Sequence, residues 1–187
     1  KFLGINALAS VGASTSVVFL ILGFCNGCCG GFGIPVAQKF GARDYSTMRS
    51  YVAVSLKLAA GMSVVIALLT CILCEDILRI MRTPENIFEG AYAYLLVTFI
   101  GVPCTFFYNL LSSIIRALGD SKTPLLFVFI ACMINIVVDF VLVGYFHMGA
   151  KGAAIATVSA QGFSFLFALV YLFKKGIGYS FYKEDIC

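Results

Sequence analysis

The segment Arg116-Ala117-Leu118-Gly119-Asp120-Ser121-Lys122-Thr123-Pro124 leads into an apolar run whose only strongly polar side chains are Asn135 and Asp139. A short turn then joins this run to a second apolar run, which carries Thr157 and Gln161. Because the connection is so short, two helices formed by these runs must lie antiparallel and adjacent. The sequence therefore predicts a helical hairpin that contains four polar groups.

The distances of these polar groups from the turn predict their depth. Asp139 and Thr157 each lie nine residues from Met148, and Asn135 and Gln161 each lie thirteen residues from it. The two polar residues of each run are spaced i, i+4 and therefore share one helix face. In an antiparallel pair, equal distance from the turn means equal depth. We therefore expect Asp139 to lie opposite Thr157 at one level, and Asn135 to lie opposite Gln161 at a second level. The spacing leaves open whether the two faces point at each other.

The composition is that of a membrane protein. Hydrophobic residues make up 61% of the 187, charged residues only 12%, and the mean hydropathy is +1.00. Soluble domains carry about 25% charged residues, and about 20 apolar helical residues cross a bilayer. We therefore expect an all-α, polytopic transmembrane helix bundle. Its five spans are expected at about residues 12–35, 50–74, 88–112, 124–146 and 150–173.

The net charge of +4 does not indicate a nucleic-acid partner, because the basic residues are few and lie between apolar runs. Basic residues in short loops set the orientation of a membrane protein, and the more basic side faces the cytoplasm. With five spans, the side expected to be cytoplasmic carries eight basic residues: Lys39, Arg43, Arg49, Arg116, Lys122, Lys174, Lys175 and Lys183. The opposite side carries four, namely Lys1, Arg79, Arg82 and Lys151.

The cysteine and histidine content predicts neither an enzyme nor a metal centre. Cys25 and Cys28 have C-x-x-C spacing, as do Cys71 and Cys74, but no histidine or further cysteine accompanies them at ligand spacing. Their expected role is to fill apolar space. The single histidine, His147, lies in the turn of the hairpin. We therefore expect no catalytic residues and no cofactor.

Local signals predict where helices begin, end and bend. We expect the first span to end at Pro35, and Thr83-Pro84 and Thr123-Pro124 each to supply a cap and a first helical residue. Pro103 should bend the third span, because proline cannot donate the hydrogen bond to the preceding turn.

Glycines in the first span give a weaker signal. The spacings Gly23-x-x-x-Gly27 and Gly27-x-x-x-Gly31 predict that another helix approaches closely there. The alternative interpretation is a locally bent, weak helix end.

Asp139 is the only acid deep inside the expected spans. It follows Pro124 by fifteen residues, which is about 22 Å along a helix and beyond the middle of the bilayer. An unpaired carboxylate at that depth costs at least a few kcal/mol, and such residues usually mark ion pathways. We therefore predict a cation or proton coupling site made by Asp139, Asn135 and Thr157, with Gln161 as possible support. The alternative is that Asp139 only pins two helices together.

Four segments resemble the multidrug and toxic compound extrusion (MATE) transporters in order and spacing: residues 38–44, 116–124, 135–139 and 149–157. The family consists of two six-helix lobes, and the resemblance implies helices two to six of the amino-terminal lobe over residues 1–187. It also implies a secondary antiporter that exports organic, often cationic, drugs in exchange for H⁺ or Na⁺. In some members the coupling site uses the residues that match Asn135, Asp139 and Thr157.

The same resemblance defines the expected partners and location. The chain begins at Lys1 without methionine or a signal peptide, so we expect a fragment that needs the first helix, with its aspartate, and the carboxy-terminal lobe. The expected partners are the lipid bilayer and a drug-like small molecule, in the cell membrane and most simply the bacterial inner membrane. The alternatives are a lipid-linked oligosaccharide flippase of the same superfamily and a non-transporting structural subunit. Lys57 is the only cation well inside a span, and such flippases often have several.

Overall fold

The computed structural model describes residues 5–174, and side chains from residue 9 to residue 173. Over this range the chain is entirely helical apart from short turns. The helices are α1 (Ile5–Gly41), α2 (Tyr45–Ile72), α3 (Cys74–Ile80), α4 (Glu85–Ile100), α5 (Val102–Ala117), α6 (Lys122–Asp139), the π-helix η1 (Phe140–Tyr145) and α7 (Gly149–Lys174).

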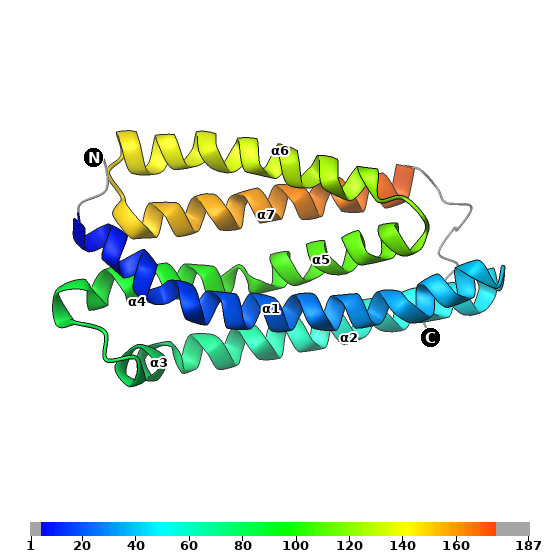
Figure 1. Cartoon of the computed structure of the whole chain (residues 1–187), viewed down its shortest axis with the longest axis horizontal. Helices are drawn as coiled ribbons and strands as arrows, with labels where there is room; N and C mark the ends of the chain where they lie inside the picture. Colours follow the sequence, from blue (N-terminus) through cyan, green and yellow to red (C-terminus); the bar gives the residue numbers. More distant parts are fainter. Residues whose placement is uncertain (1–4, 175–187) are drawn as a thin grey trace.

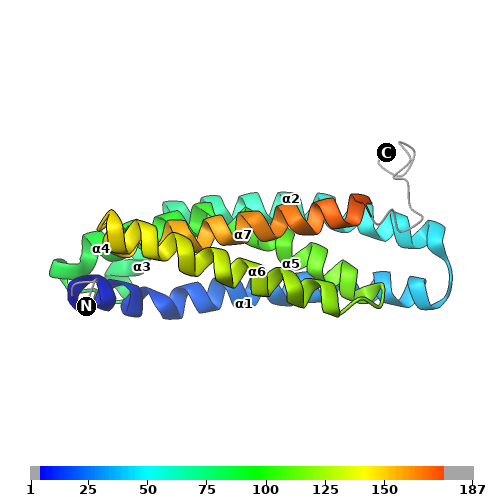
Figure 2. The ribbon, with the colours of Figure 1, turned by 90° about the horizontal axis from the view of Figure 1, so that it is seen from above.

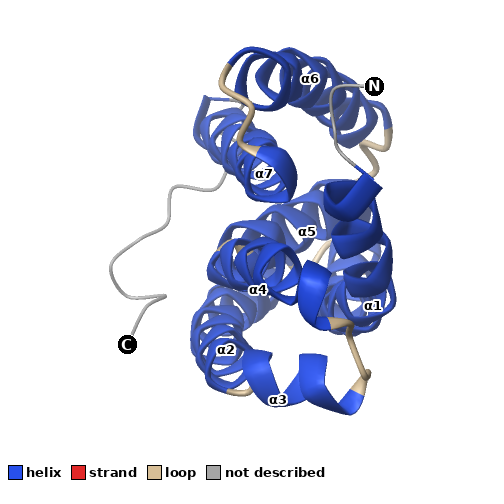
Figure 3. Ribbon diagram, turned by 90° about the vertical axis from the view of Figure 1, so that its left-hand side faces the viewer, coloured by secondary structure: helices blue, strands red, loops and turns tan. Residues whose placement is uncertain are grey.

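The long helices run roughly antiparallel along one axis (Figures 1 and 2). Helices α1, α2, α4 and α5 surround the main core, in which Phe99, Phe106 and Leu110 are fully buried. The α6–α7 hairpin lies to one side of this group, as the end view shows (Figure 3). Helix α7 packs against α4, α5 and α6, so it joins the hairpin to the rest of the bundle.

The all-α, multi-pass helix bundle is confirmed, with four to five candidate spans among the described residues. Helices α1, α2, α7 and the continuous α6–η1 segment are each long and apolar enough to cross a membrane. Helices α4 and α5 pass the same test only as a pair, which is bent by 45° and makes the fifth span if it crosses as one. The predicted bend near Pro103 is therefore confirmed. The break itself lies at Gly101, and Pro103 occupies the first turn of α5, where a missing backbone donor costs little.

Three expected helix boundaries are wrong. Helix α1 continues through Pro35 to Gly41, since a membrane helix tolerates one proline when its neighbours support it. Helix α4 begins at Glu85 with Pro84 as the N-cap, and the buried Thr83 hydroxyl makes no hydrogen bond. Helix α6 begins at Lys122 rather than at a capping Thr123. Pro35 therefore lies inside α1, Pro84 lies one residue before α4, and Pro124 is the third residue of α6.

The close approach expected at Gly23, Gly27 and Gly31 is wrong among the described residues, because a Cβ placed on any of the three would meet no atom within 4 Å. Another glycine of the same helix, Gly33, does lie against a second helix, beside Ser113 of α5. Helices also approach closely at Gly90, beside Ser10, and at Gly101, beside Val158. The x-x-x spacing gave the wrong positions because it does not say which helix face is covered.

Cysteines pack as predicted. Cys25, Cys29 and Cys74 are almost or fully buried in the main core. The Cys29 thiol also contacts the Phe106 carbonyl oxygen of α5 at 3.4 Å.

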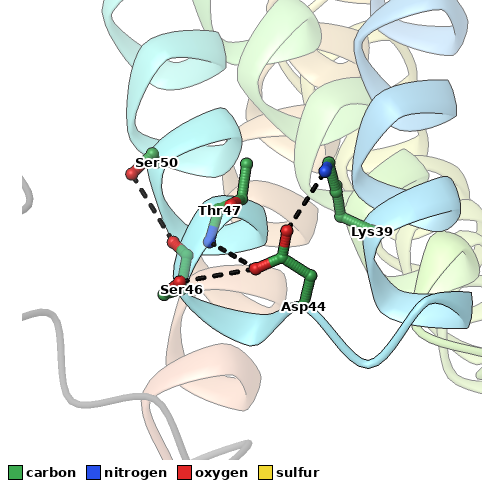
Figure 4. Close-up of polar contacts among 5 residues, drawn as sticks. All are labelled: Lys39, Asp44, Ser46, Thr47 and Ser50. Atoms are coloured by element: carbon green, nitrogen blue, oxygen red, sulfur yellow. Dashed lines mark hydrogen bonds and ion pairs between the residues drawn. The ribbon is translucent and has the colours of Figure 1, made fainter.

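The turn between α1 and α2 is held by Asp44, the N-cap of α2 (Figure 4). Its Oδ1 accepts from the Thr47 backbone N–H at 3.3 Å, and its Oδ2 pairs with Lys39 Nζ at 3.1 Å. The hydrogen bonds from Thr47 and then from Lys39 lower the pKa of the Asp44 carboxyl from 3.8 to about 2. The ionised form of Asp44 therefore supports this turn.

Stability should depend on the titration of Asp44. Because its pKa is lowered on folding, its contribution is complete above about pH 4 and is lost as the pH falls toward 2. We expect the melting temperature of the parent to exceed that of Asp44→Asn at pH 5, and the difference to vanish near pH 2. Lys39→Gln removes one partner and should shrink the difference. A gap between parent and Asp44→Asn that stays constant over this pH range would contradict the assignment.

Candidate functional site

The α6–α7 hairpin brings Asn135 and Thr157 together, one from each helix. In one orientation of the Asn135 amide, its nitrogen donates to Thr157 Oγ1 at 3.5 Å. The Thr157 hydroxyl in turn donates to the Ala153 carbonyl oxygen of its own helix at 3.0 Å. The two polar faces of the hairpin therefore point at each other, which spacing alone could not establish.

The predicted levels of the hairpin are wrong by about one turn. The structure pairs Asn135 with Thr157, whereas equal counting from Met148 pairs Asp139 with Thr157. Part of this shift comes from η1, which begins directly after Asp139. The wider turns of a π-helix hold more residues than α-helical turns, so the α6 side needs more residues to reach the same depth. A π-helical segment beside a functional residue is also a frequent feature of such sites.

The Asn135 amide has two usable orientations. In the one above, its oxygen faces Asp139. In the reversed orientation, its nitrogen donates to Asp139 Oδ2 at 3.3 Å and its oxygen accepts from the Thr157 backbone N–H at 3.2 Å. The reversed orientation suits an ionised carboxylate, which only accepts hydrogen bonds. The first suits a protonated carboxyl, which donates to the amide oxygen.

Asp139 is partly buried, and it lies close enough to Tyr94 of α4 for its charge to act on the phenol. Its Oδ1 atom is buried and has no hydrogen-bond partner among the described residues. An unsatisfied buried carboxyl oxygen calls for an explanation, such as a proton, an ion or a water molecule. The burial of Oδ1 places at least one carboxyl oxygen inside the described part of the protein.

A recess of about 220 Å³ continues from this pair along the hairpin toward α5. Gln161 lines it, and the Oε1 atom of Gln161 is buried without a hydrogen-bond partner in the described part of the chain. The complete lining consists of Tyr108, Val128, Ala131, Cys132, Asn135, Thr157, Ala160, Gln161 and Ser164. Three of the four predicted polar residues, Asn135, Thr157 and Gln161, therefore line one recess. Asp139 lies next to it and bonds to Asn135 in the reversed amide orientation.

A second polar cluster fixes the other end of the hairpin. Asp120, in the loop before α6, accepts hydrogen bonds from the Tyr171 hydroxyl of α7 and from Thr123 Oγ1, the latter at 2.7 Å. It also accepts from the Thr123 backbone N–H at 3.1 Å and so takes the capping role expected of Thr123. This cluster holds α6 against α7, and thereby helps to keep Asn135 opposite Thr157.

Sequence reasoning missed Tyr94 and Tyr108. Tyr94 is near enough to Asp139 to feel its charge. Tyr108 lines the recess and donates to the Pro124 carbonyl oxygen at 3.4 Å. The available signal was weak, because a tyrosine within an apolar span also serves as an ordinary packing residue. Tyr94 belongs to α4 and Tyr108 to α5, and the packing of these two helices beside the hairpin is set by the tertiary structure.

The bent helical bundle with a partly buried carboxyl group is that of a multi-pass membrane protein, and its similarity to known proteins identifies the family. The MatE family model matches residues 1–141. The chain is 37% identical over 174 residues to "Probable multidrug resistance protein YpnP" of Bacillus subtilis, a match that covers 93% of this chain and 39% of that protein. It is 33% identical over 179 residues to "Probable multidrug resistance protein YoeA" of the same organism, with 94% and 39% covered.

A solved structure described as "Crystal structure of MATE in complex with MaL6" superposes with a TM-score of 0.91 at 26% identity, covering 98% of this chain and 41% of the other. The chain therefore belongs to the MATE transporter family. It spans about two fifths of the length of the curated relatives that it matches.

Proposed function

We propose that this chain is part of a secondary active antiporter that exports organic, often cationic, compounds in exchange for H⁺. Asp139 is the coupling residue of the proposal, Asn135 and Thr157 are its partners, and Gln161 supports the recess. The family membership and the relatives named as multidrug resistance proteins support this assignment. The observation that carries it is the buried, unpartnered Oδ1 atom of Asp139 next to an amide that can serve either protonation state.

The proposed exchange uses the two orientations of Asn135. When Asp139 is ionised, the Asn135 nitrogen donates to its Oδ2 atom, and the negative charge is available to a cationic compound. When Asp139 takes up a proton, its O–H donates to the Asn135 oxygen, and the amide nitrogen turns to Thr157 Oγ1. The Asn135 amide then offers one hydrogen bond to the Asp139 carboxyl group in each protonation state, as a residue that binds and releases a proton requires. A bound compound and a proton compete for the same carboxyl group.

We further propose that residues 1–187 form helices two to six of the amino-terminal lobe, with α4 and α5 together as one of them. The activity then requires the remaining helix of this lobe and the carboxy-terminal lobe. The protein would act in the cell membrane of a bacterium, with the lipid bilayer and a drug-like compound as partners. The bacterial source of the matched relatives supports this location.

Exchange in sealed vesicles tests the proposed activity. The whole transporter is reconstituted, and export of a fluorescent organic cation is followed under either an imposed pH gradient or an imposed Na⁺ gradient. We expect the pH gradient to drive export, a protonophore to stop it, and vesicles without transporter to show none. Export driven by Na⁺ with the pH clamped would contradict the choice of H⁺, and export driven by neither gradient would contradict antiport.

A further inference from the structure

An apolar groove lies between α2, α5 and α7, away from the Asp139 recess, with which it shares no lining residue. Its lining is Met48, Arg49, Val52, Leu56, Leu111, Ile114, Leu118, Leu169, Leu172 and Phe173. We propose that this groove binds an acyl chain of an anionic phospholipid, with the lipid phosphate against the Arg49 guanidinium. The proposal does not depend on the transport activity.

The shape of the groove suits a hydrocarbon chain. Among the described residues that line the groove, Arg49 is the only polar one, and the volume is about 110 Å³. Pockets for drug-sized ligands hold roughly 300 to 1,000 Å³, so this groove takes part of a chain rather than a ring system. Its inner wall is well buried, as at Met48 and Leu111, whereas Phe173 at the end of α7 is 67% exposed. The groove is therefore apolar inside and open at its Phe173 edge.

The charge around the groove favours an anionic headgroup. We call the end of the bundle that carries the α1–α2 and α5–α6 turns, at the right in Figure 1, the basic end. Up to residue 173 it carries five basic residues, Lys39, Arg43, Arg49, Arg116 and Lys122, against two acids, Asp44 and Asp120.

Hydrogen bonds already engage both acids. Asp44 accepts from Lys39 and Thr47, and Asp120 accepts from Thr123 and Tyr171. The basic end therefore keeps an excess of positive charge. Basic pockets between membrane helices at such an end bind the headgroups of anionic lipids.

Arg49 links the two features. It lies in the second turn of α2 and is partly buried, so its charged group stands where the apolar groove meets the basic end. A guanidinium presents a planar fork of donors that matches a phosphate. A lipid seated here would place its tail in the groove and its phosphate at the polar boundary in a single binding mode.

Tryptophan fluorescence gives a direct test, because the chain contains no tryptophan. Phe173→Trp supplies one indole that lines the groove. The whole transporter, with any tryptophan outside these 187 residues replaced by phenylalanine, is titrated in mixed micelles with brominated phosphatidylglycerol or brominated phosphatidylcholine that have the same acyl chains. We expect half-maximal quenching at a fraction of phosphatidylglycerol about fivefold lower, as one basic contact with an anionic lipid provides.

Two variants divide the effect into its parts. Arg49→Gln should abolish the preference for phosphatidylglycerol, whereas Arg116→Gln, an exposed arginine of the same end outside the groove, should keep it. Val52→Phe fills the groove and leaves the arginine, so it should weaken quenching by both lipids. The variants are compared at equal helix content by circular dichroism.

Several results would overturn the proposal. Equal quenching by the two lipids in the parent would show that the groove has no preference for an anionic lipid. Loss of the preference in Arg116→Gln as well as in Arg49→Gln would show that it comes from the general surface charge of the basic end. Unchanged quenching in Val52→Phe would show that no chain enters the groove. Displacement of brominated phosphatidylglycerol by millimolar inorganic phosphate would show that the anion alone is recognised.

Discussion

Asp139→Asn in the whole transporter should reduce ion-driven export to the level of vesicles without protein, while membrane insertion stays near that of the parent. The substitution keeps the shape of the side chain and its ability to bond with Asn135, but it removes the group that gains and loses a proton. Coupling then has no titrating group in this hairpin, because Asp139 is the only acid deep inside the spans of the chain. Export is measured in vesicles over a series of pH values.

Partner substitutions should have smaller effects. Asn135→Ala and Thr157→Ala each remove one neutral hydrogen-bonding group, which is worth about 0.5–1.5 kcal/mol, or roughly two- to tenfold in rate. Asp76→Asn makes the same chemical change on an exposed residue of α3 and serves as the control. Export by Asp139→Asn at the parental rate across the pH series would reduce Asp139 to a packing residue.

Gly101→Ala should destabilise the fold by about 1–3 kcal/mol, the usual cost of overpacking a buried site. Gly101 is buried at the break between α4 and α5. A Cβ there would overlap Val158 of α7, with Cγ1 at 2.8 Å and Cβ at 3.1 Å. Valine is branched at Cβ and cannot turn aside easily. The backbone angles of Gly101, φ −78° and ψ −11°, suit alanine, so the cost is steric.

Matched variants isolate this clash. Gly27→Ala changes a glycine with open space around it and should be neutral, or stabilising by up to about 1 kcal/mol through helix propensity. Val158→Ala introduced together with Gly101→Ala removes the overlapping methyl groups and should recover part of the loss. A thiol-reactive fluorophore reports thermal unfolding in detergent, because Cys25 and Cys29 become accessible only when the core opens. Equal melting temperatures for Gly101→Ala and Gly27→Ala would contradict the close packing of α5 on α7.

The sequence was sufficient to predict the class of fold and to select the polar residues of the α6–α7 hairpin as a candidate site. Long apolar runs predicted five spans, because a bilayer forces any backbone within it into regular hydrogen-bonded helices. Pro103 predicted the bend of the third span. Isolation of Asp139 in an apolar run, with Asn135 one turn earlier, singled out the polar face of α6. These inferences depend on composition and local spacing, which a single sequence contains in full.

Only the tertiary structure determined the register between α6 and α7 and the residues that lie next to the polar face of α6. In the structure Asn135, and not Asp139, lies opposite Thr157, and the π-helix after Asp139 contributes to this shift. Capping by Asp120, continuation of α1 through Pro35, and the close contact at Gly101 depend on which groups neighbouring helices bring within reach. Tyr94 joins the site only because α4 packs beside the hairpin. Helix packing in space is set by many weak contacts between distant segments, and local sequence patterns do not contain them.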